Sequence, residues 1–585
     1  MRLYAVTGRS FLLNAVLKPH SSDILSPKVI TFPRFFVFLL RIIGLSLSQP
    51  TKNIMGRYIN QGNLAFRKIV NQEYVDKTSL IPLINATLNT EDCYSCVTRC
   101  RRFGKSMAAK MLCAYYDKSC YSRELFKGLE AEKAESFEAH LNKYYVICLD
   151  MTEFTTKYRG ERDIVRRMQA QVINDILAEF PQITRREDDD LMDVLCSISE
   201  STGEHFMMII DEWDAILREM GDDTQITTAY VDLLRRLFKG FSSSRVFAGA
   251  YLTGILPIKK YDTESALNNF CEYSMVDPAF LASCYGFTRE EVEALARRHG
   301  ADRKDFNLET LKMWYDGYII GREPSIYNPY SVMKALKRGS CQSYWTTTSA
   351  YDSVKTYIEM NFEGLKDDII RMLAGEHVDV DTTGFLNDMR IVRSKDDVLT
   401  VLIHLGYLTY DYEHQVCYIP NKEVADEMNK AIKATSWVSV AKTIQDSKSL
   451  LEATTAGNEE AVARAIDRAH DENTSILSYN DENSLACVLT IAYIWARNEY
   501  IVHREYATGK GYADLVMIPR RHVAKPALII ELKFSHSADT AIAQIKRKDY
   551  PVKIAEYAGD MLLVGINYDK ATKQHTCKIE RLEKN

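Results

Sequence analysis

The segment that most restricts the fold of this chain is CVTRCRRFGKSMAAKMLCAY, residues 96–115. It predicts a short strand, a loop that ends in Gly104-Lys105-Ser106, and a helix that begins at this tripeptide. The start of a helix offers free backbone N–H groups and the positive end of the helix dipole, and both favour a phosphate. We therefore expect the loop to bind a nucleotide, with Lys105 reaching the outer phosphates and the Ser106 hydroxyl holding Mg2+.

The motif is incomplete, because Arg99 stands where the first glycine of GxxxxGK[ST] belongs. Taken alone, the loop is therefore also compatible with a basic turn before an ordinary helix. Several arginines are candidates for stabilising phosphate charge, although a solvated surface position is the commoner role for an arginine. They are Arg99, Arg101, Arg102, Arg235 and Arg236.

A second apolar strand, HFMMIIDEW at residues 205–213, ends in two acidic residues, as a Walker B strand does. We expect Asp211 to coordinate Mg2+ through water and Glu212 to polarise the water that attacks the γ-phosphate. A third strand ends at Thr253, where a polar sensor residue would lie beside the γ-phosphate. In this order along the chain, the motifs favour an ATPase that uses ATP and Mg2+.

The alternation of segments predicts three domains after a separate N-terminal extension, residues 1–54. Residues 55–284 alternate apolar runs with amphipathic helices, the pattern of an α/β fold in which helices cover a parallel sheet. Helical spacing dominates residues 285–450, where Val398–Asn421 predicts a helix and a hairpin, a candidate winged-helix element. Residues 451–585 predict a further α/β domain with the order helix, strand, strand, helix, strand. The strands expected in the first domain are residues 94–98, 144–149, 206–210 and 246–253.

Two strands near the C-terminus carry charged residues in a pattern typical of metal-dependent nucleases. They are GYADLVMIP at 511–519 and ALIIELKF at 527–534. Because side chains alternate faces along a strand, Glu531 and Lys533 point the same way. With Asp514 they form a D…ExK set, in which the carboxylates hold Mg2+ and the lysine orients or deprotonates water. The alternative is an edge strand with a surface ion pair.

Residues that flank these strands extend the candidate site. Glu482, at the start of the preceding helix, is a candidate acidic ligand of the metal. Gln544 lies on the following predicted helix together with Lys546 and Lys548, and these residues are candidates for contacting a nucleic-acid backbone. Capping and surface roles are equally compatible with Glu482 and Gln544.

Charge and cysteine content limit the partners and the compartment. Lys plus Arg number 74 and Asp plus Glu number 79, which gives a net charge of -5, so nucleic-acid binding requires local basic patches. The 13 cysteines are scattered, which indicates free thiols in a reducing cytoplasm. Cys93 and Cys96 resemble half of a zinc site, but no matching pair occurs elsewhere.

The N-terminal extension contains one apolar run of nearly membrane-spanning length, residues 29–48. Arg34 and Arg41 interrupt it, and an arginine at the bilayer centre costs about 3 kcal/mol, so we expect no stable membrane association. A start site assigned too early, with the protein beginning at Met55, is the favoured interpretation. A weak anchor and a targeting segment are the alternatives.

Several short sequence segments, in their order along the chain, resemble the predicted AAA-ATPase-like family of bacteria. They are YVDKTSLI (74–81), TRCRRFGKS (98–106), ELFKGL (124–129), IIDEWD (209–214), LTGILPIKK (252–260), ALNNF (266–270), WYDGY (314–318) and YNPYSV (327–332). The last 120 or so residues resemble the PD-(D/E)xK nuclease domain that is usually fused to this ATPase. The resemblance implies a P-loop ATPase of the AAA-like class joined to a restriction-endonuclease-like fold, in a bacterial protein.

The resemblance also implies roles for residues that match the family motifs. The ATPase motifs match Gly104, Lys105, Ser106, Asp211 and Glu212, and the nuclease motifs match Asp514, Glu531 and Lys533. Cys100 stands where the family commonly has proline, and the first Walker glycine is missing here as in the family, so slow or absent hydrolysis stays open.

Three functions compete on these grounds. The leading one is an ATP-dependent nuclease with DNA as the expected substrate, RNA and a homo-oligomer being open. The second is an ATPase switch whose inactive nuclease fold binds nucleic acid or protein. The third is a non-catalytic scaffold.

Overall fold

A computed structural model describes most of the chain after residue 55. The described residues are 56–258, 267–303, 305–345, 350–360, 362–385, 392–433, 438–473, 488–507, 512–520, 523–548 and 560–582. Residues from Met55 onward form one compact unit. The N-terminal extension with its apolar run, and Glu482, lie outside the described residues. Within the described ranges, every helix is too short or too polar to cross a membrane.

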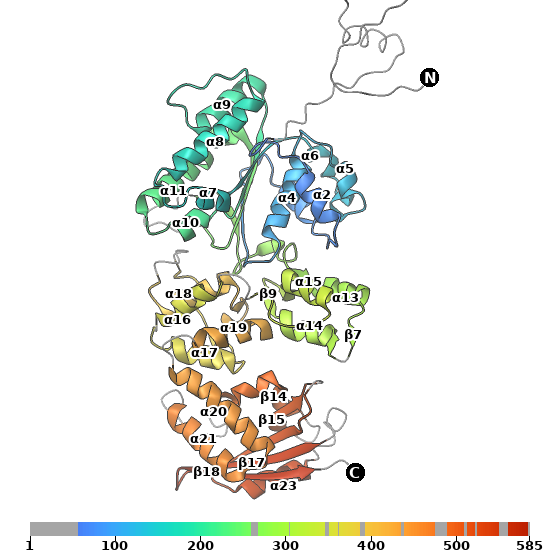
Figure 1. The fold of residues 1–585 in the computed structure, drawn as a ribbon, viewed down its shortest axis with the longest axis vertical. Helices are drawn as coiled ribbons and strands as arrows, with labels where there is room; N and C mark the ends of the chain where they lie inside the picture. The colour runs from blue at the N-terminus through green and yellow to red at the C-terminus, as the bar shows by residue number, and fades with distance from the viewer. Residues whose placement is uncertain are drawn as a thin grey trace, which may run out of the picture. The chain divides into compact units, whose positions relative to one another are not determined.

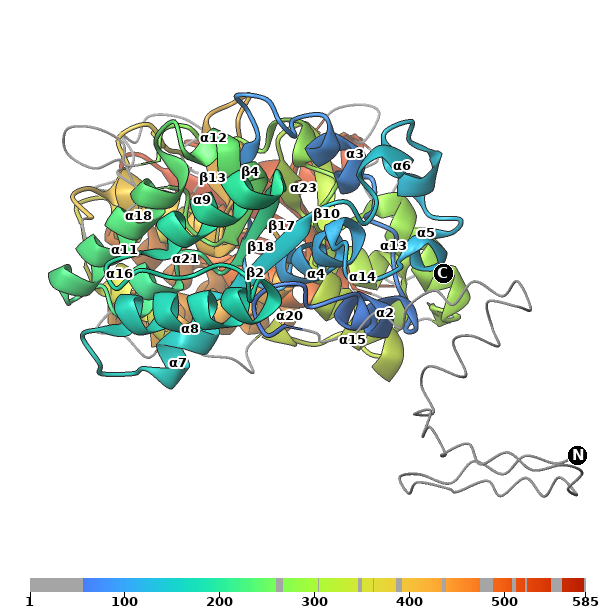
Figure 2. The same ribbon diagram turned by 90° about the horizontal axis from the view of Figure 1, so that it is seen from above.

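The first part of this unit is a parallel sheet with helices on both faces (Figures 1 and 2). Its strands lie in the order β2-β3-β4-β1-β5. They are β1 (Tyr94–Thr98), β2 (Tyr145–Asp150), β3 (Phe206–Asp211), β4 (Phe247–Gly254) and β5 (Cys271–Tyr273). The four strands predicted from the sequence are confirmed to within one residue at each end. The three-residue strand β5 was not predicted, because its sequence CEY has too few apolar residues to form a pattern.

Side-chain alternation along the strands gives each face of this sheet its own hydrophobic core. Met208 and Ile210 of β3 face one group of helices, whereas Met207 and Ile209 face the other group. The first group is α7 (Met151–Lys157), α8 (Ile164–Glu179), α9 (Leu191–Thr202), α10 (Ala215–Glu219), α11 (Thr224–Phe238) and α12 (Ser243–Val246). The second group is α2 (Leu64–Val70), α3 (Leu80–Asn85), α4 (Lys105–Tyr116), α5 (Arg123–Phe126), η1 (Glu130–Lys133) and α6 (Phe137–His140).

The strand order brings the predicted nucleotide motifs to one edge of the sheet. Because the strands are parallel, the carboxyl ends of β1, β3 and β4 lie at the same edge. Thr98, which precedes the phosphate loop, is in register with Gly254, and Asp211 is in register with Thr253. The loop after β1 and the acidic pair after β3 are therefore neighbours across β4.

The middle region is mostly helical, with small antiparallel sheets between the helices (Figure 1). The helices are η2 (Ala279–Leu281), α13 (Arg289–Arg298), α14 (Leu308–Tyr315), α15 (Pro329–Arg338), α16 (Ala350–Glu359), α17 (Leu365–Leu373), α18 (Lys395–Leu405) and α19 (Lys422–Lys433). The strands are β6 (Phe287–Thr288), β7 (Asp302–Arg303), β8 (Phe306–Asn307), β9 (Tyr318–Ile320), β10 (Glu323–Tyr327), β11 (Val378–Asp379), β12 (Thr409–Asp411) and β13 (Val416–Tyr418). The helix and hairpin expected within Val398–Asn421 are confirmed as α18, β12 and β13; a winged-helix element stays a prediction.

The C-terminal part is a mixed sheet in the order β14-β15-β16-β17-β18, in which only β16 and β17 pair in parallel among the described strands. The strands are β14 (Tyr500–Ala507), β15 (Tyr512–Pro519), β16 (Ala527–Phe534), β17 (Met561–Asp569) and β18 (Gln574–Leu582). Helices α20 (Val438–Thr455) and α21 (Glu459–Asn473) pack on one face, and α23 (Ala538–Arg547) packs on the other. The short η4 (Ile494–Asn498) precedes β14. The predicted order of elements missed β14 and β18, because these edge strands are rich in polar residues.

Candidate nucleotide and metal sites

The phosphate loop between β1 and α4 needs unusual backbone angles. Gly104 has a φ of 96° and is the residue before the first turn of α4, and Arg102 has a φ of 74°. Glycine adopts such angles without a steric penalty, whereas arginine does so at a cost. The loop thus places the first residues of α4, Lys105 and Ser106, at the carboxyl edge of the sheet, as the sequence predicted.

Lys105 lies inside the loop with only 4% of its surface exposed. Its Nζ donates to the carbonyl oxygens of Arg99 and Cys100, at 3.0 and 3.3 Å. The same Nζ is 3.7 Å from Oε1 of Glu212. The structure therefore brings the predicted lysine and the second acidic residue of the Walker B strand together.

Ser106 and Asp211 are also brought together, since the Ser106 hydroxyl lies close enough to the Asp211 carboxylate to lower its pKa. Burial raises the pKa of Asp211 to about 6, and the Glu212 and Asp150 carboxylates raise it further, while Ser106 and Lys105 oppose the shift. A hydroxyl beside a desolvated carboxylate is a donor set that suits Mg2+. The residues present therefore fit the cation that the sequence predicted.

Glu212 is held by an arginine that the sequence analysis did not identify. Arg218 Nη2 donates to Oε2 of Glu212 at 2.6 Å, and its Nε donates to Oδ2 of Asp214 at 2.9 Å. The same Oδ2 of Asp214, which is fully buried, accepts the backbone N–H groups of Ile255 and Leu256 at the end of β4. The available signal was the spacing of Asp214 and Arg218, four residues apart across the start of α10.

These groups line a cavity of about 910 Å³. Its walls include Gly104, Lys105, Ser106, Asp150, Asp211, Glu212 and Arg218 from the parallel-sheet part of the chain. Arg101 and Arg102 of the loop line it too, as do Lys334 and Lys337 of α15. The volume lies in the range of sites for small ligands and cofactors, and the cationic walls favour an anionic ligand.

The middle region holds the phosphate loop by three separate contacts. The ring of Tyr330 lies 4.1 Å from the guanidinium of Arg102. Phe103 packs edge-on against Tyr318 with the ring centroids 5.1 Å apart. Gly406, which follows α18, leaves no room for a side chain, because a Cβ there would lie 2.8 Å from Sγ of Cys100.

Three of the predicted arginines do not reach the cavity. Arg99 is fully buried, and its guanidinium donates to backbone carbonyl oxygens, including those of Tyr273 and Ser274. Arg99, at the position of the missing glycine, therefore has a structural role and does not stabilise phosphate charge. Arg235 and Arg236 lie half-exposed on α11, where they pair with nearby aspartates. Neither lines the cavity.

Thr253 is likewise not among the residues that line the cavity. It is completely buried in the middle of the sheet, on a strand with neighbours on both sides. The hydroxyl has no hydrogen-bond partner among the described residues. The structure therefore places it in register with Asp211 without exposing it to a nucleotide.

The second candidate site lies where β15 and β16 carry their charged residues on one face. Asp514, Glu531 and Lys533 share the face of Val516 and Ile529, which packs against α23. An oxygen of Asp514, Oδ2, accepts the backbone N–H of Leu532 at 2.7 Å. Lys533 Nζ is 3.5 Å from Oε1 of Glu531. The three predicted residues therefore come together, as the strand pattern required.

Glu531 is the most perturbed group of this site. It is only 1% exposed, and burial raises its pKa to about 7; Asp514 raises it further, while Lys533 and Lys548 lower it. Its Oε2 is buried without a hydrogen-bond partner among the described residues. An orphaned carboxylate oxygen next to a second carboxylate suits a divalent cation, which would supply the missing ligand contact.

Of the candidate residues that flank the two strands, Gln544 and Lys548 lie near Glu531, whereas Glu482 lies outside the described residues. Gln544 of α23 donates to Oε1 of Glu531, so it supports the carboxylate from the neighbouring helix. Lys548 adds positive charge close enough to lower the pKa of Glu531. In the described part of the chain, no group of three acidic, histidine or cysteine side chains is arranged to hold a metal ion. Whether Glu482 completes such a group stays a prediction.

Comparison with protein families gives a match for each of the two regions that contain the candidate sites. Residues 61–263 match the model described as predicted AAA-ATPase, and residues 480–577 match that of the PD-(D/E)XK nuclease superfamily. The chain joins an AAA-ATPase-like domain to a PD-(D/E)XK nuclease-like domain. The phosphate loop and the Asp211–Glu212 pair fall within the first match, and Asp514, Glu531 and Lys533 fall within the second.

Other comparisons are more distant. Among solved structures, one similar chain is the ORC2 protein of Aeropyrum pernix, in complexes with ADPNP and ADP. It is 11% identical, the likeness covers 63% of this chain and 98% of that chain, and the TM-score is 0.28. A comparison with curated proteins gives no match. The AAA-ATPase-like and nuclease-like domains are therefore assigned by the family models.

Proposed function

We propose that this protein binds and hydrolyses ATP with Mg2+ and that its nuclease-like domain cleaves nucleic acid, with DNA as the expected substrate, in a bacterial cytoplasm. The observation that carries the proposal is the set of Asp514, Glu531 and Lys533 on one sheet face, with a buried Glu531 oxygen that has no hydrogen-bond partner among the described residues. We further propose domain boundaries at residues 55–284, 285–450 and 451–585.

In the nuclease-like site, each residue has a distinct task. Asp514 and Glu531 would hold Mg2+, which when bound polarises the scissile phosphate. Lys533, whose Nζ lies near Glu531, would orient the attacking water and stabilise negative charge on the phosphate. Gln544 would keep the Glu531 side chain in place through its hydrogen bond.

In the AAA-ATPase-like site, Lys105 and the N-terminus of α4 would bind the phosphates. Glu212 would orient the attacking water, and Arg218 would fix the orientation of Glu212. Ser106 and Asp211 would hold the Mg2+ that accompanies the nucleotide.

A second candidate is an ATPase switch whose nuclease fold is inactive and binds nucleic acid or protein. The observation that favours it is that the described residues provide two carboxylates and no third metal-binding side chain at the nuclease-like site. The two candidates differ only in whether the C-terminal domain cuts.

The deciding experiment is a cleavage assay on linear, nicked and single-stranded DNA and on RNA, with Mg2+ or Mn2+, with and without ATP. We expect the wild type to cut and Lys533→Ala and Asp514→Ala to lose cutting by about 100-fold or more, since they remove charge stabilisation or a metal ligand. Lys105→Ala and Glu212→Gln should lose ATP turnover.

Arg464→Ala on α21 is the matched control, because this exposed arginine pairs with Glu460 on a helix that packs against the opposite face of the sheet. It should cut like the wild type. A wild type that turns over ATP but cuts no substrate would support the switch, and one that binds no ATP analogue would exclude both candidates.

A further inference from the structure

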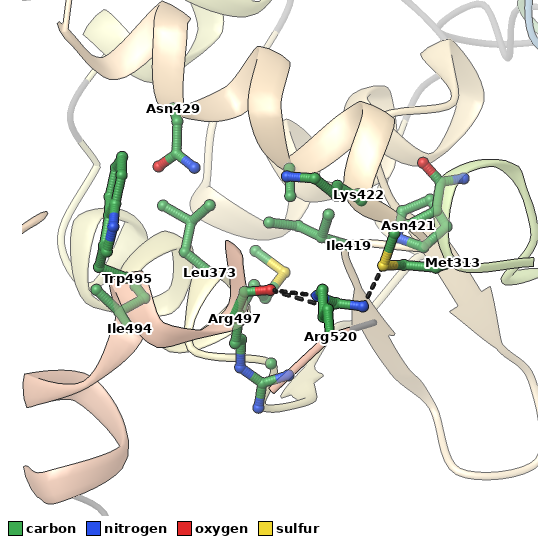
Figure 3. A pocket seen from close by; sticks show the side chains of 14 residues that line it. Met313, Leu373, Ile419, Asn421, Lys422, Asn429, Ile494, Trp495, Arg497 and Arg520 are labelled. Atoms are coloured by element: carbon green, nitrogen blue, oxygen red, sulfur yellow. Dashed lines mark hydrogen bonds between the residues drawn. The ribbon is translucent and has the colours of Figure 1, made fainter. Parts of the chain in front are cut away.

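A second cavity, of about 230 Å³, lies between the middle region and the nuclease-like domain (Figure 3). The middle region contributes α14, α17 and the start of α19, and the nuclease-like domain contributes η4 and the end of β15. Its titratable lining residues are all cationic: Lys422, Arg497 and Arg520. Neither the ATPase nor the nuclease-like site uses this cavity.

Arg520 lies in the wall of the cavity with only neutral hydrogen-bond acceptors. Its Nε and Nη2 donate to the carbonyl oxygen of Arg497, at 3.3 and 2.9 Å, and its Nη1 contacts Sδ of Met313 (Figure 3). No carboxylate within the described ranges forms an ion pair with it. Burial, together with the charge of Arg497, lowers the pKa of Arg520 to about 10. The guanidinium of Arg520 thus has N–H groups that make no hydrogen bond to the described residues, and these residues place no carboxylate against it.

A second guanidinium, that of Arg497, lies against Gly375, where a larger residue would displace it. A Cβ on Gly375, which has a φ of +82°, would lie 2.2 Å from the Arg497 guanidinium carbon. The carboxylate that most influences Arg497 is Glu376, which is already shared by Arg371 at 3.1 Å and Arg504 at 3.9 Å. Positive charge is therefore in excess on this side of the cavity.

The opposite wall also favours an anion. Lys422 is the first residue of α19, a helix of 12 residues, and lines the cavity together with Asn421. Lys422 is paired with Asp426 at 3.2 Å, so its own charge is balanced. The N-terminal end of α19 still contributes the positive end of a helix dipole.

We propose that this cavity binds a phosphate group and so links the middle region to the nuclease-like domain. Arginine forks match phosphate oxygens in geometry and charge. Two guanidiniums, of which that of Arg520 has no carboxylate partner among the described residues, suit a phosphate better than a monovalent anion. Sites for whole drug-sized ligands begin near 300 Å³, so this smaller cavity fits a phosphate group and little more. The phosphate comes either from the end of a nucleic-acid strand or from inorganic phosphate.

The test is titration calorimetry on the full chain carrying Lys105→Ala, which disables the nucleotide loop, in buffer with EDTA. The ligands are inorganic phosphate, a short single-stranded DNA with a 5′-phosphate, and the same DNA without it. Arg520→Gln and Arg497→Gln should each weaken binding about tenfold or more, the usual effect of losing a charged hydrogen bond. Binding of both phosphate ligands identifies the free anion as sufficient, and binding of the phosphorylated strand alone identifies the strand.

Arg464→Gln is the matched control, because this exposed arginine of α21 pairs with Glu460 and does not line the cavity, and it should leave binding within about twofold of the parent. Gly375→Ala and Arg520→Lys test the site without deleting a charge, and both should weaken binding. The proposal is overturned if no phosphate ligand binds the parent. It is equally overturned if every folded cavity variant binds as tightly as Arg464→Gln does.

Discussion

The guanidinium of Arg218 lies between Glu212 and the completely buried Asp214, so a single residue joins the candidate nucleotide site to the buried interior of the domain. Removing one member of a buried ion pair leaves the other charge unpaired, which typically costs about 3–5 kcal/mol. We predict that Arg218→Ala lowers the free energy of unfolding by roughly this amount, as measured by urea denaturation.

Arg235→Ala provides the comparison for this prediction. Arg235 is half-exposed, and its partner Asp232 lies 2.9 Å away on the same helix. Exposed pairs contribute little, so the free energy of unfolding should change by at most about 0.5 kcal/mol. Equal destabilisation by both substitutions would show that the buried pair has no special role.

Glu531 gives a prediction about pH in protein freed of metal by EDTA. The folded pKa of about 7 is above the ordinary value of 4.5, so the folded state holds this proton more tightly than the unfolded state. The resulting stability is fully present below about pH 4.5 and is lost as the pH rises through about 7. We predict that Glu531→Gln flattens the decline of the free energy of unfolding between pH 5 and 8.

The size of this effect is of order 1–3 kcal/mol, because one pKa unit corresponds to about 1.4 kcal/mol. Denaturation curves at pH 5 and pH 8 measure it directly. A wild type and a Glu531→Gln variant with parallel pH profiles would contradict the assigned burial of an ionisable Glu531.

Among the elements, α18 reaches the phosphate loop through Gly406. A Cβ there would lie 2.6 Å from Cβ of Cys100, and the φ of +86° strains any other residue. We predict that Gly406→Ala displaces the loop and weakens binding of an ATP analogue at least several-fold, in addition to costing about 1 kcal/mol for the backbone angle. Fluorescence titration with a labelled analogue measures the affinity.

Gly457 allows the two effects of this substitution to be separated. It follows α20 with a φ of +74°, and a Cβ at this position would meet nothing within 4 Å. Gly457→Ala should therefore cost similar backbone strain while leaving nucleotide affinity unchanged. Loss of affinity in both variants would mean that general destabilisation, not the contact with Cys100, is responsible.

At the scale of the whole molecule, Tyr330, Tyr318 and Gly406 connect the middle region directly to the phosphate loop. The backbone N–H of Gly286 also donates to the carbonyl oxygen of Phe103, at 3.2 Å. We predict that an ATP analogue slows hydrogen exchange at residue 286, in α15 and at the end of α18, because loop ordering suppresses local opening.

Hydrogen-exchange mass spectrometry of the full chain, with and without the analogue and Mg2+, tests this coupling. Lys105→Ala should show no slowing, because it loses the phosphate contact. Protection confined to residues 56–284 in the wild type would show that the middle region does not respond to nucleotide.

The sequence by itself determined the parts whose pattern is local. Apolar runs of four to eight residues located β1 to β4, and strand alternation put Glu531 and Lys533 on one face, because both signals depend on near neighbours in the chain. The short or polar strands β5, β14 and β18 were not predicted, because they form by pairing with neighbouring strands and their own residues show no clear strand pattern.

Only the tertiary structure decided which charges meet. The sequence did not distinguish Arg99 from Arg101, but the structure buries Arg99, whose guanidinium donates hydrogen bonds to backbone carbonyl oxygens. Thr253 is buried inside the sheet. The contact of Tyr330 with Arg102 and the cavity around Arg520 bring together residues that lie about 200 or more positions apart in the chain. Burial and long-range contacts determine the charge state of a side chain and whether a ligand can reach it. Neither can be deduced from the residues next to it in the sequence.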